Sequence, residues 1–157
     1  MTDFATIVRP AEGIQIIENV TEQPGVPTGE GELGPLLWGE GTQTYFLDIP
    51  AGAYLDEHPH PFEALIYAVR GRFVVCCRGE RYLLEPGSLM SFGKDVPTGY
   101  EIPFDESAFM LVFRGEKAAM DQQAFVKRFT PSQPASLKDL PEDHPARVFA
   151  SQVNPDY

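Results

Sequence analysis

Two histidines, His58 and His60, carry the clearest chemical signal in this sequence. They are two residues apart, so on an extended chain both imidazole rings project from the same face. Two imidazoles on one face can offer neutral nitrogens to a single Zn, Fe, Mn, Cu or Ni ion. Pro59 and Pro61 alternate with them, and because proline cannot donate a ladder hydrogen bond, the segment suits an irregular strand end. We therefore expect His58 and His60 to bind one divalent metal ion.

A tight site needs a further ligand, because catalytic zinc has three protein ligands and structural zinc four. Four residues are candidates. Glu63 lies an odd number of residues from both histidines, so it faces the opposite side of a strand unless the chain kinks. Asp56 has the same parity as the histidines, but it and Glu57 lie on an expected loop. His144, the third histidine of the chain, would have to reach the site from the C-terminal tail.

The segments around the histidines have the pattern of short β-strands, rich in β-branched and aromatic residues and separated by Gly and Pro turns. Short strands at such spacing, without helices between them, indicate an antiparallel sandwich or barrel. The expected strands cover residues 42–49, 62–69, 73–77, 81–84, 88–92 and 107–113, with an early strand at 14–17.

The two ends of the chain have different patterns. Residues 23–34 are dense in Gly, Pro and Glu and predict an exposed loop, with a lid over a pocket as the alternative. Residues 116–129 contain no Gly or Pro and predict a helix with Ala119, Phe125 and Phe129 near one face.

The length of 157 residues fits a single domain. We expect one all-β domain over residues 1–157, with a barrel core at about 42–113 and a helix and extended tail over 116–157. The tail from residue 137 mixes proline with a short helical segment, and we expect it to pack against the barrel or a second subunit.

Gly52, His58, His60 and Gly71 have the spacing of the first motif of the cupin superfamily, which this segment resembles. A fainter second motif begins at Gly87. The resemblance implies a jelly-roll barrel, also described as a double-stranded β-helix, that binds a small organic molecule. It also implies a homodimer.

The sequence departs from that resemblance at two metal ligands. The family uses two histidines and a glutamate of the first motif and one histidine of the second. Ala64 and Thr98 stand at the glutamate and second-motif histidine positions. We therefore expect a non-standard metal site, with Ala64, Thr98 and Tyr100 lining the substrate pocket.

Charge excludes several classes of partner. The chain has 12 basic and 23 acidic residues and a formal charge of −11, which disfavours nucleic acids and anionic membranes. Its apolar runs are strand-sized, so no membrane span is expected. The first residues lack the basic and apolar regions of a signal peptide, so we expect a cytoplasmic location.

Cys76 and Cys77 are adjacent and should be free packing residues, because strand neighbours point to opposite faces.

Three functions are open at this point. The first is a metal-dependent cupin enzyme, such as a dioxygenase, isomerase or cyclase, in which the ion polarises a substrate oxygen. The second is a metal-free cupin that binds a small, largely apolar ligand. The third is a metal-free isomerase in which His58 or His60 acts as the base.

Overall fold

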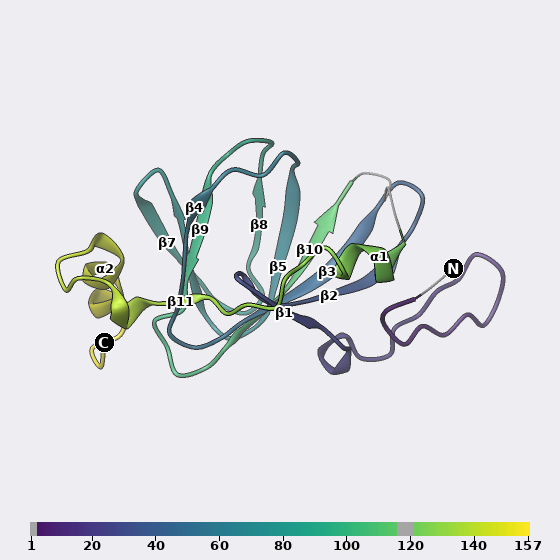
Figure 1. Cartoon of the computed structure of the whole chain (residues 1–157), viewed down its shortest axis with the longest axis horizontal. Coiled ribbons are helices and arrows are strands. Elements are labelled where there is room, and N and C mark those ends of the chain that lie inside the picture. Colours follow the sequence, from purple (N-terminus) through teal and green to yellow (C-terminus); the bar gives the residue numbers. More distant parts are fainter. Residues whose placement is uncertain (1–2, 116–120) are drawn as a thin grey trace.

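The computed structural model describes residues 3–115 and 121–157, and its dominant feature is a pair of antiparallel β-sheets (Figure 1). One sheet has six strands in the order β1-β2-β3-β10-β5-β8, and the other has five in the order β11-β4-β9-β6-β7. The strands are β1 Val26–Thr28, β2 Gly31–Trp38, β3 Gln43–Ile49, β4 Ala53–His58, β5 Ala64–Arg70, β6 Phe73–Cys77, β7 Glu80–Leu84, β8 Leu89–Phe92, β9 Thr98–Glu101, β10 Ala108–Arg114 and β11 Ala135–Ser136. The predicted all-β jelly-roll architecture is confirmed.

The core lies between the two sheets, and the strand sequences show why. On β5, buried residues alternate with more exposed ones, so Ala64, Ile66 and Ala68 face inward while Leu65 and Tyr67 face outward. This alternation is typical of an antiparallel sheet with one face on the core. The inner faces of the other strands, among them β3, β6 and β10, contribute to the same core, whose largest fully buried side chains include Phe73, Ile49 and Met110.

The expectation of an exposed loop over residues 23–34 is wrong. This segment contains β1 and the start of β2, which pair as an antiparallel hairpin through the turn at Gly29 and Glu30. Leu33 belongs to the core between the sheets, and Leu36 belongs to a second cluster on the outer face. The polar residues of the hairpin obscured the apolar residues that anchor it on both faces of the sheet.

The N-terminal segment forms a partial outer layer over the six-stranded sheet. Ala5, Ile7 and Ile17 pack with Phe46 and Phe109 on that face. The early strand expected at residues 14–17 is reduced to a single bridge between Val8 and Ile16. In Figure 1 the N-terminal segment extends beyond the β2 end of the molecule.

The helix predicted over residues 116–129 is shorter in the described residues. Helix α1 covers Gln122–Val126, and Asp121 caps it by accepting a hydrogen bond from the Ala124 amide. Residues 116–120, including Ala119, lie outside the described residues. Phe125 and Phe129 pack against the core, with their ring centroids 5.4 Å apart.

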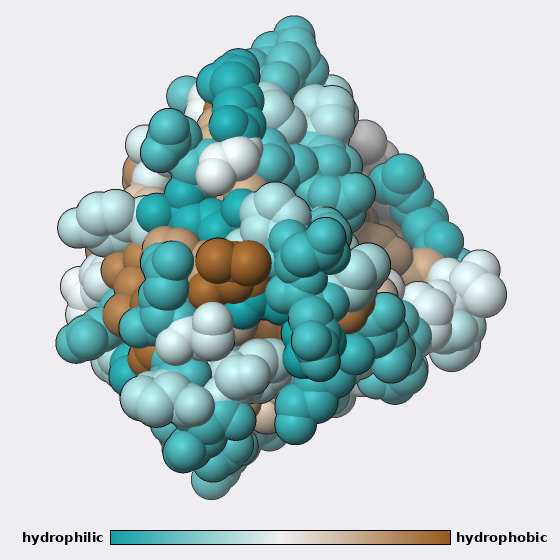
Figure 2. Space-filling view, turned by 90° about the vertical axis from the view of Figure 1, so that its left-hand side faces the viewer, coloured by the Kyte–Doolittle hydropathy of each residue, from teal (hydrophilic) through white to brown (hydrophobic). Residues whose placement is uncertain are grey.

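The C-terminal tail packs on the five-stranded sheet. It contains the short 3-10 helix η2 Leu137–Asp139 and helix α2 Pro145–Val153. A second 3-10 helix, η1 Val20–Glu22, belongs to the N-terminal segment. Ala146 and Ala150 of α2 are buried, and the Asn154 side chain donates a hydrogen bond to the Pro103 carbonyl at 2.9 Å. Figure 2 shows the face on this side, where hydrophilic side chains dominate and hydrophobic ones form small separate areas.

None of the helices in the described ranges is long and apolar enough to cross a membrane.

The two cysteines are both free, as their adjacency predicts. Cys76 is buried on β6, whereas Cys77 is half-buried at the end of that strand.

Candidate metal centre

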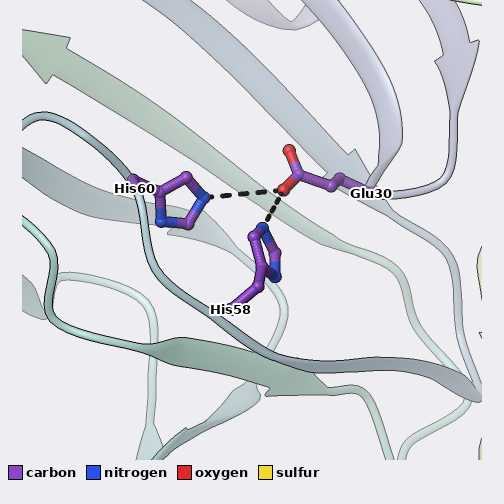
Figure 3. Close-up of side chains that lie close together, drawn as sticks. All are labelled: Glu30, His58 and His60. Carbon is purple, nitrogen blue, oxygen red and sulfur yellow. Dashed lines mark hydrogen bonds and ion pairs between the residues drawn. The ribbon is translucent and has the colours of Figure 1, made fainter.

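Three side chains from separate parts of the chain point toward one another (Figure 3). Glu30 lies in the turn between β1 and β2, His58 ends β4, and His60 lies in the segment that follows. Glu30 Oε1 is 2.9 Å from His58 Nε2 and 3.7 Å from His60 Nε2. One donor atom from each residue lies within 4.8 Å of the other two.

The hairpin turn fixes the position of Glu30. The buried Thr28 hydroxyl donates a hydrogen bond to the Gly31 carbonyl at 2.7 Å and accepts one from the Glu30 amide at 3.1 Å. Gly31 has a φ of 109°, and a Cβ atom there would lie 2.6 Å from the Asp48 carbonyl oxygen. Only glycine combines this backbone conformation with such close packing, so Gly31 allows the turn to sit tightly on β3.

A β-bulge in β4 determines where His58 points. Leu55 pairs with Tyr100, but His58 pairs with Thr98, so β4 has one more residue than β9 in this interval. Gly99 lies opposite the extra residue, and a Cβ atom there would be 2.5 Å from the Leu55 carbonyl oxygen. Bulges of this kind redirect side chains next to binding sites.

His60 is held by its backbone and by aromatic packing. Its carbonyl accepts a hydrogen bond from the Asp95 amide at 2.8 Å. Its ring centroid lies 5.3 Å from that of Phe62 and 5.1 Å from that of Phe92. The His60 ring is also 4.4 Å from the His58 ring, so the two imidazoles lie side by side.

The electrostatics of the group favour a charged Glu30. Burial opposes ionisation of Glu30, but hydrogen bonds and charge from His58 and His60 outweigh it and lower the pKa of Glu30 to about 2. The hydrogen bond to Glu30 raises the pKa of His58 to about 9, although partial burial acts in the opposite direction. At neutral pH the metal-free protein therefore holds a Glu30 carboxylate against a protonated His58.

The three residues fit a divalent transition-metal ion. With bonds of about 2.0–2.2 Å to nitrogen or oxygen, donors that share one ion lie roughly 3–3.5 Å apart, close to the 2.9 and 3.7 Å between Glu30 and the two histidines. His58 Nδ1 is 3.1 Å from the Asp56 carbonyl oxygen. Since a carbonyl only accepts, this contact places the proton of a neutral His58 on Nδ1 and leaves Nε2 as the ligand atom.

A cavity of about 290 Å³ adjoins the group and includes Glu30 and His60 in its wall. Most of its lining is apolar or aromatic, with two tyrosines and two arginines as the other polar groups. The remaining lining residues are Leu33, Tyr45, Leu47, Phe62, Ile66, Phe92, Tyr100, Val112, Arg114, Phe125, Arg128 and Phe129. Burial raises the pKa of Tyr45 and of Tyr100, so both phenols are protonated at neutral pH.

The three residues expected to line the substrate pocket do not all lie in the cavity wall. Tyr100 lines the cavity. Thr98 is buried opposite His58, and its hydroxyl has no hydrogen-bond partner among the described residues. Ala64 lies in the core next to Phe92 on β8, and the cavity lining of the described chain does not include it.

None of the four third-ligand candidates belongs to the cluster that the described residues form. Glu63 is exposed. Asp56 and Glu57 lie on β4 and not on a loop, and the bulge there breaks the parity on which Asp56 was considered. The Glu57 carboxylate instead accepts hydrogen bonds from Cys76 and from the amides of the β6–β7 turn. His144 caps α2 by accepting from the Ala146 amide at 3.1 Å.

Glu30 is the member of this group that sequence reasoning did not find. Thr28, Gly29, Glu30 and Gly31 between apolar strands are typical of a hairpin turn, which was the available signal. Even that signal places Glu30 only at a turn. Its contact with His58, 28 residues away, depends on how the hairpin packs against β4.

Comparisons with known proteins agree with this architecture. Residues 45–114 match the family model described as Cupin domain. No curated protein matches the sequence.

Among the solved structures that share the fold are three of low sequence identity. A protein designated ethanolamine utilization protein Q from Salmonella typhimurium LT2 has a TM-score of 0.63 and 15% identity, covering 75% of this chain and 98% of its own. TT1209 from Thermus thermophilus has a TM-score of 0.55 and 20% identity, covering 65% and 98%. An RmlC-like cupin from Shewanella frigidimarina NCIMB 400 has a TM-score of 0.53 and 18% identity, covering 62% and 88%.

Residues 45–114 therefore match a cupin domain, and the described chain has the fold of these solved structures. The cupin domain supports small-molecule binding, and the Glu30, His58 and His60 group can hold a metal ion.

Proposed function

We propose that this protein binds one divalent transition-metal ion through Glu30, His58 and His60 and acts on a small organic molecule in the adjoining cavity. The observation that carries the proposal is the convergence of three donor atoms from distant segments within 4.8 Å. A carboxylate with two histidines is a common ligand set for catalytic zinc and non-haem iron.

Each of the three residues contributes something different. Glu30 supplies the negative charge that compensates a divalent ion in a largely apolar barrel. The Asp56 carbonyl orients His58, and Phe62 and Phe92 hold His60 in place. The bound ion would act as a Lewis acid on a substrate carbonyl, enol or phenol oxygen.

The cavity wall supplies the substrate contacts. Its apolar and aromatic side chains displace water from the substrate, which strengthens polar contacts inside the cavity. The Tyr100 hydroxyl is buried and has no hydrogen-bond partner among the described residues. Because Tyr100 lines the cavity and its phenol is protonated, it can donate a hydrogen bond to a polar atom of the substrate.

The proposal is tested by metal content. Untagged protein is prepared with added Zn, Fe, Mn, Ni or Cu and measured by inductively coupled plasma mass spectrometry. We expect about one ion per chain in the wild type and none after combined His58→Ala and His60→Ala substitution. Glu30→Gln should weaken binding by more than roughly 100-fold, because losing an outer-shell partner alone costs about 10–100-fold.

Glu32→Gln is the matched control, since Glu32 is an exposed acid two residues from Glu30. It should retain the full metal content. No ion under any supplement would refute the metal site.

The Glu30–His58 pair, with its 2.9 Å contact, would then favour the second candidate, a metal-free acid–base isomerase. A bell-shaped pH–rate profile that is insensitive to chelators would identify that function.

A further inference from the structure

Two arginines line the cavity that adjoins the metal centre. Arg114 ends β10, and Arg128 follows α1. The guanidinium carbon of Arg114 lies 3.6 Å from the centroid of the Phe62 ring. Stacking of this kind uses the face of a guanidinium. Its edge, which also contacts the Tyr45 side chain, has five N–H donors and can bind a carboxylate or phosphate in addition.

The cavity is cationic within an acidic protein. Glu30 is the single acid among the described residues that line it, against Arg114 and Arg128, while the whole chain has a formal charge of −11. Charges farther away than about 8–10 Å are largely screened at physiological salt, so the local arginines dominate inside the cavity. A divalent ion on Glu30 would make the cavity more positive still.

The rest of the wall is suited to a flat apolar body. Phe62 and Phe92 have ring centroids 6.0 Å apart on one part of the wall, and Phe125 and Phe129 are 5.4 Å apart on another. Aromatic walls favour planar ligands because offset stacking and edge-to-face contacts add to the burial of apolar area. The buried Tyr100 hydroxyl is a polar group in this wall that no described residue satisfies.

We propose that the cavity binds a small organic oxyanion, a carboxylate or a phosphate ester on a planar apolar body, with the anionic group at Arg114 and Arg128. The body lies between the phenyl rings, and its other polar end reaches Tyr100 and the metal centre. This inference deepens the proposed function and rests on it for the role of the metal centre, but the arginine contacts are independent of any ion.

Calorimetric titration with three probes tests the proposal, in zinc-supplemented and in metal-free protein. The probes are 4-hydroxybenzoate, the neutral 4-hydroxybenzamide of nearly the same shape, and phenyl phosphate. We expect 4-hydroxybenzoate to bind at least about tenfold more tightly than the amide in both preparations, since hydrogen bonds to charged groups are the stronger ones. Tighter binding of phenyl phosphate than of the benzoate would support the proposal and identify a phosphate ester as the preferred oxyanion.

Substitutions locate the anionic group. Arg114→Gln should weaken 4-hydroxybenzoate binding by about tenfold and the exposed Arg128→Gln by about threefold, with little effect on the amide. Arg114→Lys, which retains the charge but not the planar fork, should give an intermediate loss. Lys127→Gln removes an exposed charge next to Arg128 and should change nothing.

The proposal is overturned if neither anionic probe binds, if the amide binds as tightly as the benzoate, or if folded Arg114→Gln and Arg128→Gln variants retain wild-type affinity. Its failure is distinguishable from failure of the metal site. Arginine-dependent binding by a protein that takes up no metal would support this inference and refute the proposed metal centre. One ion per chain without anion selectivity would support the proposed metal centre and refute this inference.

Discussion

At the scale of single residues, Glu30 and His58 form an ion pair near neutral pH when no metal is bound. The Glu30 carboxylate lies 2.9 Å from His58 Nε2, and this contact raises the pKa of His58 to about 9. A metal ion needs the same nitrogen with its proton removed. Metal binding and protonation of His58 therefore compete for one atom.

This competition predicts the pH dependence of metal affinity. The His58 pKa is raised, so near pH 7 the imidazole is mostly protonated and binding must release about one proton. Affinity for Zn²⁺ should therefore increase with pH between 6 and 8 by up to about tenfold per unit and level off above about 9. Calorimetry in buffers of different ionisation enthalpy measures the released proton directly. Release of no proton at pH 7 would contradict the assigned ligand atom.

The residues of the site differ in how far the sequence could predict them. His58 and His60 could be recognised because a spacing of two residues has a simple meaning on an extended chain. Glu30 could not, because its role depends on a hairpin packed next to β4 and not on any local pattern. The face of the strand on which Asp56 lies could not be predicted either, because counting odd and even residues fails where a bulge adds one.

At the scale of elements, the β1–β2 hairpin turn delivers the carboxylate. The Thr28 hydroxyl makes two hydrogen bonds inside this turn, at 2.7 and 3.1 Å, and is buried. Thr28→Val keeps the shape of the side chain but leaves two backbone groups without these partners. We expect a loss of about 1–3 kcal/mol in unfolding free energy and roughly 10-fold weaker metal binding, measured by denaturant titration and metal calorimetry.

Thr21→Val is the control for this substitution. Thr21 also makes a local hydrogen bond, to Asn19, but it is exposed and lies outside the hairpin. The Thr21→Val substitution should leave metal affinity unchanged. Equal metal affinity in Thr28→Val and wild-type protein would show that the turn does not position Glu30.

The bulge in β4 is the second element that positions a ligand. A Cβ atom at Gly99 would approach the backbone of Leu55 and Glu57 to 2.5 and 2.9 Å. Gly99→Ala should therefore shift the bulge, destabilise the protein by about 1–3 kcal/mol and reduce metal affinity by displacing His58. Gly41→Ala is the control, because no atom lies within 4 Å of a Cβ there. A stable Gly99→Ala variant with normal metal binding would contradict this role of the bulge.

The strands themselves could largely be predicted, and the exceptions have physical causes. Six predicted segments correspond to β3, β5, β6, β7, β8 and β10, where alternation or apolar runs are strong. β4 and β9 flank the metal centre and contain Asp56, Glu57, His58 and Gly99, residues with little strand preference. Their pairing across the barrel holds them in the sheet, so local propensity did not indicate them.

At the scale of the whole molecule, the proposed metal centre joins segments that are far apart in the sequence. Glu30 and His58 are 28 residues apart. Glu30 lies in a turn of the six-stranded sheet, and His58 ends a strand of the five-stranded sheet. An ion bound only by the folded protein stabilises it in proportion to the logarithm of the free ion concentration. At a free concentration 100 times the dissociation constant, the gain is about 2.7 kcal/mol.

Thermal unfolding should therefore respond to metal. We expect Zn²⁺ to raise the melting temperature of the wild type by about 8 °C at such saturation, given the size of the domain. A chelator should reverse the shift, and Glu30→Gln should abolish it. An equal shift in Glu30→Gln would indicate that the ion binds elsewhere.

The most direct test of the account is an anomalous diffraction experiment on crystals of the zinc-loaded protein at the zinc absorption edge. We predict one strong peak in the cavity, at about 2.0–2.2 Å from a Glu30 carboxylate oxygen, His58 Nε2 and His60 Nε2. A peak bound to the two histidines with Glu30 turned away, or a peak outside the cavity, would contradict the assignment of Glu30 as the third ligand.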